Sequence, residues 1–122
     1  MSSRTLTVLT TVDSLTQARR IARALVTRGL AACVHIAPIE SFYRWNGRLQ
    51  HEREFQLTLT TTAARTAALQ AALRSLHPYE LPAIAVLRPA AVHAPYARWV
   101  QQSCIRPTTR TLRGQAKRGT AA

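Results

Sequence analysis

The side chains best suited to chemistry are two cysteines, four histidines and five acids, and few of them are close together in the sequence. Cys33 and Cys104 stand far apart and fit no paired CxxC spacing. Zinc sites usually draw four ligands from closely spaced Cys and His pairs, so this spacing does not indicate one. In a reducing compartment both thiols are expected to be free.

His77 is the candidate metal ligand, because an imidazole nitrogen readily binds a metal ion. It precedes Pro78 at the expected end of a helix, where it could equally bond the last helix carbonyls. The two roles are compatible, and capping is favoured. The other three histidines have no ligand spacing and are interpreted as surface or packing residues; they are His35, His51 and His93.

Cys33 could act as a soft copper ligand or as a nucleophile, but it lies among Ala and Val on an expected strand. A cysteine in such surroundings usually behaves as a small buried hydrophobic residue, and we favour that interpretation. A catalytic Cys33–His77 pair would also need an orienting group and an oxyanion site. The sequence identifies neither, so we expect no enzymatic activity.

Five large aromatic side chains could line a ligand cleft between subunits or anchor an interface. Trp and Tyr are enriched at buried contacts, so anchoring is favoured, and both roles can coexist at a cleft. Glu54 stands among basic residues and is expected to pair with Arg44 across a hairpin. The five aromatics are Tyr43, Trp45, Tyr79, Tyr96 and Trp99.

The helices and strands that position these residues follow from the hydrophobic periodicity. Ser14 and Gln17 have the spacing of a capping box, and Gly29 is suited to end the same helix. Thr62 is the expected N-cap of a second helix, and Pro95 suits the first turn of a third. The periodicity predicts strands over 5–11, 30–45 and 82–87, a return strand after the 46–47 turn, and helices over 15–28, 63–76 and 95–104.

The middle of the chain predicts a long β-hairpin. Asn46-Gly47 is typical of a type I′ turn, in which both central residues need positive φ. On the return strand, Phe55, Leu57 and Leu59 alternate with polar residues. Pro38 predicts an edge position or a bulge, because proline donates no ladder hydrogen bond. A ribbon this long is not stable alone and needs a partner.

The element order is β-α-β-β-α-β followed by an extra helix. Right-handed crossovers then give a four-stranded antiparallel sheet with the first two helices on one face. The opposite face is expected to carry uncovered apolar residues. Other subunits are the simplest cover for such a face.

Composition gives one domain over residues 1–104 and a basic tail over 105–122 that is expected to be disordered. The net charge is +12, and the tail holds five of the basic residues and no acid. No run of 18 apolar residues or secretory signal is visible, so we expect a cytoplasmic protein with no membrane partner. A basic surface binds anions weakly, and no specific nucleic-acid partner is expected.

Four motifs, in order, resemble the CutA divalent-cation-tolerance proteins over about residues 5–104. Two lie within the predicted hairpin: the run from Leu30 through Trp45 to Gly47, and Glu52-Arg53-Glu54-Phe55. The others are His77-Pro78-Tyr79-Glu80-Leu81-Pro82 and Tyr96-Ala97-Arg98-Trp99-Val100. The resemblance implies a ferredoxin-like α+β sandwich, a homotrimer similar in plan to the PII signalling proteins, and a non-catalytic role in tolerance of divalent cations, copper especially.

The resemblance also leaves alternatives and departures. A PII-like sensor of small ligands at intersubunit clefts is the alternative function. Thr60 and Ala83 stand where many members of the family carry a lysine and a glutamate, and Thr10 and Leu76 replace a cysteine and a histidine. No cofactor is implied beyond a weakly bound divalent cation such as copper, with His77 as its remaining ligand. The cleft or interface candidates are Cys33, Tyr43, Trp45, Glu54, His77, Tyr79 and Trp99.

Overall fold

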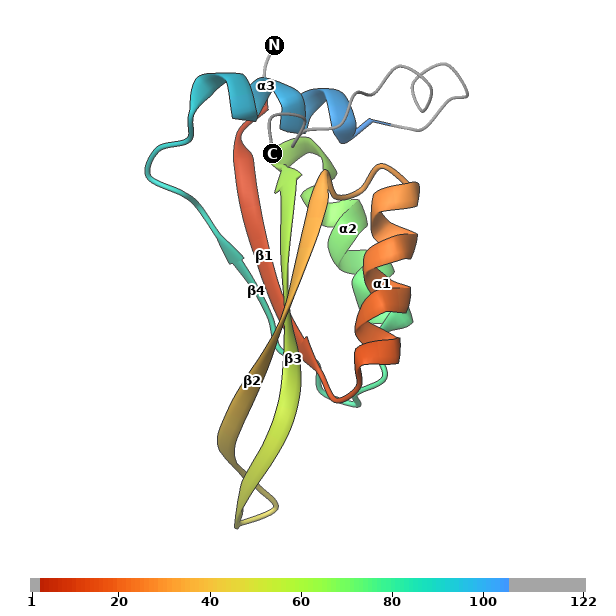
Figure 1. The fold of residues 1–122 in the computed structure, drawn as a ribbon, viewed down its shortest axis with the longest axis vertical. Helices are drawn as coiled ribbons and strands as arrows, with labels where there is room; N and C mark the ends of the chain where they lie inside the picture. Colours follow the sequence, from red (N-terminus) through yellow and green to blue (C-terminus); the bar gives the residue numbers. More distant parts are fainter. Residues whose placement is uncertain (1–2, 106–122) are drawn as a thin grey trace.

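A computed structural model describes residues 3–105 of the chain. Two helices cover one face of a four-stranded sheet, and a third helix lies across one end of it (Figure 1). The tail over 105–122 that is expected to be disordered lies, except for Ile105, outside the described residues. The elements are β1 Thr5–Val12, α1 Leu15–Thr27, β2 Cys33–Trp45, β3 Arg48–Thr62, α2 Ala63–Leu76, β4 Ile84–Leu87 and α3 Ala94–Ser103.

The sheet has the strand order β2-β3-β1-β4, and every neighbouring pair is antiparallel. The predicted α+β fold with its β-α-β-β-α-β order and additional helix is therefore confirmed. β2 is an edge strand, as Pro38 predicts, and its pairing with β3 continues through Pro38 opposite Phe55 without a bulge. The fourth strand begins at Ile84, two residues later than the sequence predicted.

The hydrophobic core lies between the sheet and the two helices α1 and α2. Successive strand side chains point to opposite faces, so Val8 and Leu59, which are paired in register, both face the helices. α1 contributes Ile21 and Leu25, and neither side chain is exposed. The same cluster includes Val12, Ala18, Leu30, Ala31, Leu57, Leu69 and Leu73. No helix in the described part of the chain is long and apolar enough to cross a bilayer.

The ends of α1 follow the sequence prediction closely. Ser14 is the N-cap, and its Oγ accepts a hydrogen bond from the Gln17 backbone N–H at 3.1 Å. The Gln17 side chain does not return this bond, because its Oε1 accepts from Arg20 instead. Gly29 has φ +69°, the left-handed conformation that ends helices.

The N-terminus of α2 differs from the prediction in one detail. Thr62 occupies the N-cap position, but its side chain makes no capping hydrogen bond. The hydroxyl of Ser3 accepts from the Ala64 N–H at 3.0 Å, and the Arg4 carbonyl accepts from the Ala63 N–H. A segment distant in sequence therefore satisfies these free donors of the helix.

The β2–β3 hairpin extends well beyond the rest of the sheet (Figure 1). β1 ends at Val12, opposite Phe55, so the hairpin residues past that point have no third strand beside them. Asn46 and Gly47 both have positive φ, 53° and 75°, as the predicted turn requires. Phe42 and Leu49 are exposed near the tip, at 65% and 72%.

The sheet face opposite the helices is less apolar than predicted. Its central positions carry Thr7, Thr58 and Thr60, with Leu9 and Leu87 among them. Most of the larger apolar residues of β1 and β3 lie instead on the helix face, where Val8, Leu57 and Leu59 are fully buried. Threonine suits a pleated sheet without requiring burial, so this face does not by itself require a covering subunit.

Candidate functional site: an acidic pocket beside the hairpin

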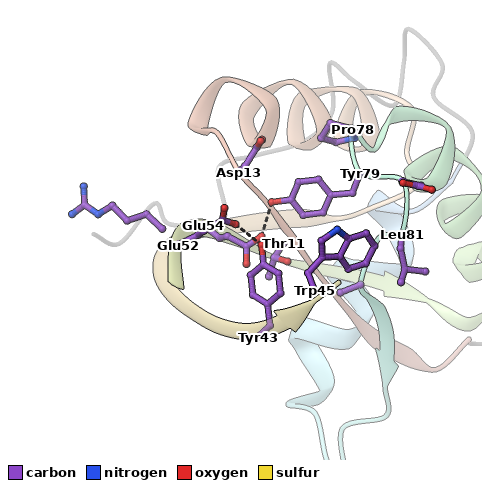
Figure 2. Close-up of a pocket in the computed structure, with 12 residues that line it drawn as sticks. Thr11, Asp13, Tyr43, Trp45, Glu52, Glu54, Pro78, Tyr79 and Leu81 are labelled. Atoms are coloured by element: carbon purple, nitrogen blue, oxygen red, sulfur yellow. Dashed lines mark hydrogen bonds between the residues drawn. The ribbon is translucent and has the colours of Figure 1, made fainter. Parts of the chain in front are cut away.

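A pocket of about 820 Å³ opens where the β2–β3 hairpin leaves the sheet (Figure 2). Its walls come from three places: the end of β1, the hairpin, and the loop between α2 and β4. The lining residues are Thr11, Asp13, Tyr43, Trp45, Glu52, Arg53, Glu54, Pro78, Tyr79, Glu80, Leu81 and Ala83.

Strand alternation explains why the hairpin side chains meet in this pocket. Tyr43 and Trp45 are two residues apart on β2, so they point to the same side of the ribbon. Glu52 and Glu54 are likewise two apart on β3, and the register places them on that side as well. The tyrosine and tryptophan rings and both carboxylates thus face one space, as Figure 2 shows.

Glu54 is the most buried charged group of the pocket, with 6% of its surface exposed. Its Oε2 accepts a hydrogen bond of 2.5 Å from the hydroxyl of Tyr79. Burial, and then this hydrogen bond, raise the pKa of Tyr79 above its usual value. The phenol therefore stays protonated and continues to donate to the carboxylate.

A second tyrosine–carboxylate pair lies nearer the solvent. The hydroxyl of Tyr43 donates to Glu52 Oε1. This hydrogen bond, more than burial, raises the pKa of Tyr43 to about 12. The pocket thus contains two tyrosine–carboxylate pairs, one buried and one near the solvent. Trp45, 44% exposed, lies beside the outer pair.

The charge of the pocket is opposite to that of the protein. The whole chain has a net charge of +12 and only five acids, and four of those five line this pocket. Arg53 is the single basic residue in the lining. Between residues 3 and 105 the one acid–base contact short enough for an ion pair joins His51 to Glu40, outside the pocket, so no arginine is in direct contact with these carboxylates. With four carboxylates and one guanidinium group in its lining, the pocket carries a net negative charge.

His77 precedes the pocket residues Pro78 and Tyr79, and its ring connects their loop to β1. Its Nδ1 accepts a hydrogen bond from the Tyr79 backbone N–H at 3.1 Å, so the proton of the neutral ring is on Nε2. Nε2 lies 3.0 Å from both the Thr11 carbonyl and the Thr10 hydroxyl. Burial lowers the pKa of His77, against the opposing effect of the bond to the Thr11 carbonyl.

This geometry bears on both roles predicted for His77. The residue ends α2, but through its backbone N–H, which donates to the Leu73 carbonyl; its ring bonds β1 and Tyr79, not the helix carbonyls. Both ring nitrogens are already hydrogen-bonded, so a metal ligand here would have to give up one of these bonds. Within the described residues no three Cys, His, Asp or Glu side chains cluster as metal ligands would. Metal binding by His77 stays a prediction.

Cys33 and Trp99 lie elsewhere, on the side of the sheet near α3. The Cys33 thiol is 3.8 Å from the Tyr96 hydroxyl, 3.9 Å from the Thr60 hydroxyl and 4.0 Å from His35 Nε2. Tyr96 in turn stacks on Trp99 with ring centroids 5.7 Å apart. Cys33 thus lies near Thr60, which pairs with Thr7 of β1, whereas His77 contacts Thr10, three residues further along β1. Cys33 and His77 therefore form no catalytic pair.

The structure collects four of the seven predicted cleft residues into the pocket: Tyr43, Trp45, Glu54 and Tyr79. The predicted Glu54–Arg44 ion pair is wrong. The register of the hairpin places Arg44 on the face of the ribbon opposite to Glu54, and Glu54 is hydrogen-bonded to Tyr79 instead. The sequence motifs did not indicate Asp13, Glu52 and Glu80 as site residues. The signal available was the scarcity of acids, since Glu40 alone lies outside the pocket.

The family model of the CutA1 divalent ion tolerance protein matches residues 6–103. This match covers most of the chain and spans all the elements described above except the first residue of β1. The chain belongs to the CutA1 family. All the CutA1 motifs recognised in the sequence fall within the matched region, and the resemblance drawn from them is confirmed.

Individual CutA relatives agree with this assignment. The divalent-cation tolerance protein CutA of Thermus thermophilus is 40% identical over 97 residues, which cover 79% of this chain and 94% of that protein. A CutA homolog of Xenopus laevis is 42% identical over 86 residues, 70% of this chain and 57% of that protein. This chain therefore spans little more than half of the Xenopus protein but nearly all of the Thermus one.

The fold agrees with solved CutA structures. The CutA of Synechococcus elongatus superposes with a TM-score of 0.82 and 42% sequence identity. The superposition covers 85% of this chain and 93% of that one. The sheet, both packed helices and the long hairpin thus belong to a CutA fold.

Proposed function

We propose that this protein acts in tolerance of divalent cations, copper in particular, as a non-catalytic binding protein whose acidic pocket is the functional site. The observation that carries the proposal is the concentration of four of the five acids around one cavity in a chain of net charge +12. If the five acids were distributed at random over the surface of so basic a protein, most of them would lie beside arginines. Here two of the four carboxylates, Glu52 and Glu54, are paired with tyrosine hydroxyls, which leave their negative charge in place.

The pocket supports binding rather than catalysis. Its tyrosines hold their protons, and His77 has both ring nitrogens hydrogen-bonded to the chain. Neither of the tyrosines is therefore available as a base. Cys33, the cysteine that lies near a histidine, is outside the pocket. Carboxylates beside aromatic rings attract cations. The lining offers only oxygen ligands, which hard divalent ions prefer, so copper(II), which prefers nitrogen ligands, would bind here weakly.

A homotrimer is part of the same proposal. The hairpin past Val12 is a two-stranded ribbon with exposed Phe42, Trp45 and Leu49, and such ribbons are not stable on their own. Its edge strand β2 offers unpaired backbone groups to a neighbouring chain. Pocket residues on the hairpin would then lie close to a subunit interface.

A tolerance assay tests the function directly. A copper-sensitive bacterial strain without its own CutA would express this protein, its Glu54→Gln variant or its Glu40→Gln variant. The amide oxygen introduced by Glu54→Gln can still accept the Tyr79 hydrogen bond, so the variant loses the charge and keeps the fold. We expect the wild type and Glu40→Gln to restore growth in copper and Glu54→Gln to lose most of that protection. Equal protection by all three would contradict the proposal.

A further inference from the structure

The outer surface of α1 carries an unneutralised row of arginines that the proposed function does not use. Arg19, Arg20 and Arg23 are all exposed on α1, and Arg28 follows at its C-cap. They line a groove of about 630 Å³ together with Thr16, Ala24 and Thr27. Residues three and four apart lie on one face of a helix, so these side chains form a continuous strip along it. We call this surface the arginine face.

No acid lies on either helix of this layer. The sequences of α1 and α2 contain no Asp or Glu, while α2 adds Arg65 and Arg74. Four of the five acids of the protein line the pocket, and Glu40 is bonded to His51 on the hairpin. Within the described residues the arginine face therefore has no ion pair. Its positive potential is fully available to an anion.

The arginine face is also partly fixed in position. The Arg20 guanidinium donates to Gln17 Oε1 through two nitrogens, at 3.0 and 2.7 Å, and to the Leu76 carbonyl at 2.7 Å. These bonds connect α1 to the end of α2. Arg19 and Arg23, which flank Arg20, make no side-chain hydrogen bond within the described residues. The guanidinium groups of Arg19 and Arg23 thus remain without a hydrogen-bond partner in this part of the chain, on a surface that the Arg20 bonds hold in position.

The chemistry of this face fits phosphate. Every lysine or arginine position in the described range is an arginine, whose planar guanidinium bonds two phosphate oxygens at once. The hydroxyls of Thr16 and Thr27 at the two ends of the groove are further phosphate donors. The strip from residue 16 to residue 27 is about 16 Å long at 1.5 Å per residue. Duplex DNA presents one phosphate charge per ~1.7 Å of its axis, so several phosphates fall within that length.

The same face does not fit a membrane. A helix that lies on a bilayer exposes apolar side chains beside its basic ones. The apolar residues of α1 are instead turned into the core, where Ala18, Ile21 and Leu25 are fully buried. Val26 alone is exposed to a substantial degree, at 42%. Binding at this surface is therefore electrostatic, without insertion.

We propose that the arginine face of α1 binds the phosphate backbone of double-stranded nucleic acid without reading its sequence. The groove has hydrogen-bond donors for phosphate, and its lining has no aromatic side chain that could stack on a base. Binding depends on release of counterions and weakens steeply with salt. This activity is separate from the acidic pocket, so either can be absent without the other.

The test measures the salt dependence of binding to a fluorescently labelled 30-base-pair DNA duplex by anisotropy, using the full chain. One variant carries Arg19→Gln, Arg23→Gln and Arg28→Gln. The matched control carries Arg48→Gln, Arg88→Gln and Arg98→Gln, which are also exposed, remove the same charge and lie off α1. Both variants keep the basic tail, so its contribution is constant. Circular dichroism checks that each is folded.

Each phosphate contact contributes about −0.9 to the slope of log K against log salt, so the α1 variant should have a slope shallower by about 3. The control should stay within about 1 of the wild type. A duplex of scrambled sequence should bind the wild type with the same slope. Equal changes in the two variants would show a general charge effect and overturn the proposal. Equally tight, α1-dependent binding to vesicles of anionic lipid at the same salt would also overturn it.

Discussion

At the scale of single residues, the pocket depends on two tyrosine–carboxylate pairs that differ mainly in burial. Tyr79 donates to the buried Glu54, and Tyr43 donates to the exposed Glu52. A buried carboxylate that loses its donor has no water to replace it, whereas an exposed one does. The two pairs therefore form a natural comparison.

Tyr79→Phe should lower the free energy of unfolding by about 1–3 kcal/mol, the cost of leaving a buried polar group without its partner. Tyr43→Phe should change it by less than about 0.5 kcal/mol, because the exposed Glu52 gains water in exchange. Urea denaturation of both variants measures the difference. Equal losses would mean that Glu54 is not the buried partner described above.

His77 gives the protein a predictable response to acid. Burial lowers its pKa in the folded state below the ordinary 6.5, so the unfolded chain binds a proton more readily as the pH falls. The stability that the neutral ring contributes is full above that unfolded value and is lost as the pH falls toward the folded pKa. The melting temperature should therefore decrease between pH 7.5 and 5.5.

His77→Gln provides the control, because glutamine does not titrate. Its melting temperature should be lower than that of the wild type at pH 7.5 but should vary less between pH 7.5 and 5.5. Differential scanning calorimetry of both proteins at the two pH values decides the matter. Parallel pH profiles would assign the acid sensitivity to other groups.

At the scale of elements, local chemistry predicted most of the fold. The Asn46-Gly47 turn, the Ser14 cap and the Gly29 helix end are fixed by backbone conformations that few residues adopt, so they could be recognised without a structure. The cap of α2 could not, because its hydroxyl comes from Ser3, 61 positions away. The pocket was only half visible for the same reason: Asp13 after β1 and Glu80 in the α2–β4 loop are brought to the hairpin only by the fold.

The Ser14 cap offers a test of this local reasoning. Ser14→Ala removes the acceptor for the Gln17 N–H and should cost about 1 kcal/mol of stability. Ser14→Asp keeps an acceptor at the same place and should restore most of that loss. Chemical denaturation measures both changes. An alanine variant as stable as the wild type would show that water replaces the cap at no cost.

At the scale of the whole molecule, the proposed trimer predicts that substitutions on the hairpin surface weaken subunit association more than substitutions elsewhere. Leu49 is 72% exposed and lies on the face of the ribbon away from the pocket. In a trimer that buries the hairpin, Leu49→Ser should weaken association while leaving each chain folded. Sedimentation should report about three times 13.5 kDa for the wild type and a smaller species for the variant at low concentration.

Arg19→Gln and Arg23→Gln are suitable controls, since both residues are exposed on α1, away from the hairpin. Their loss should leave the sedimentation of the protein unchanged. A wild-type protein that sediments as a monomer at every concentration would contradict the trimer. The acidic pocket would remain, because all the residues that line it belong to one chain.

Cation binding by the acidic pocket is the central claim. The most direct measurement is an anomalous-difference map, at the copper absorption edge, from crystals soaked in millimolar copper(II). We predict a peak inside the pocket, within reach of the carboxylates of Glu52 and Glu54. A peak beside Cys33 and His35, with none in the pocket, would contradict the central claim.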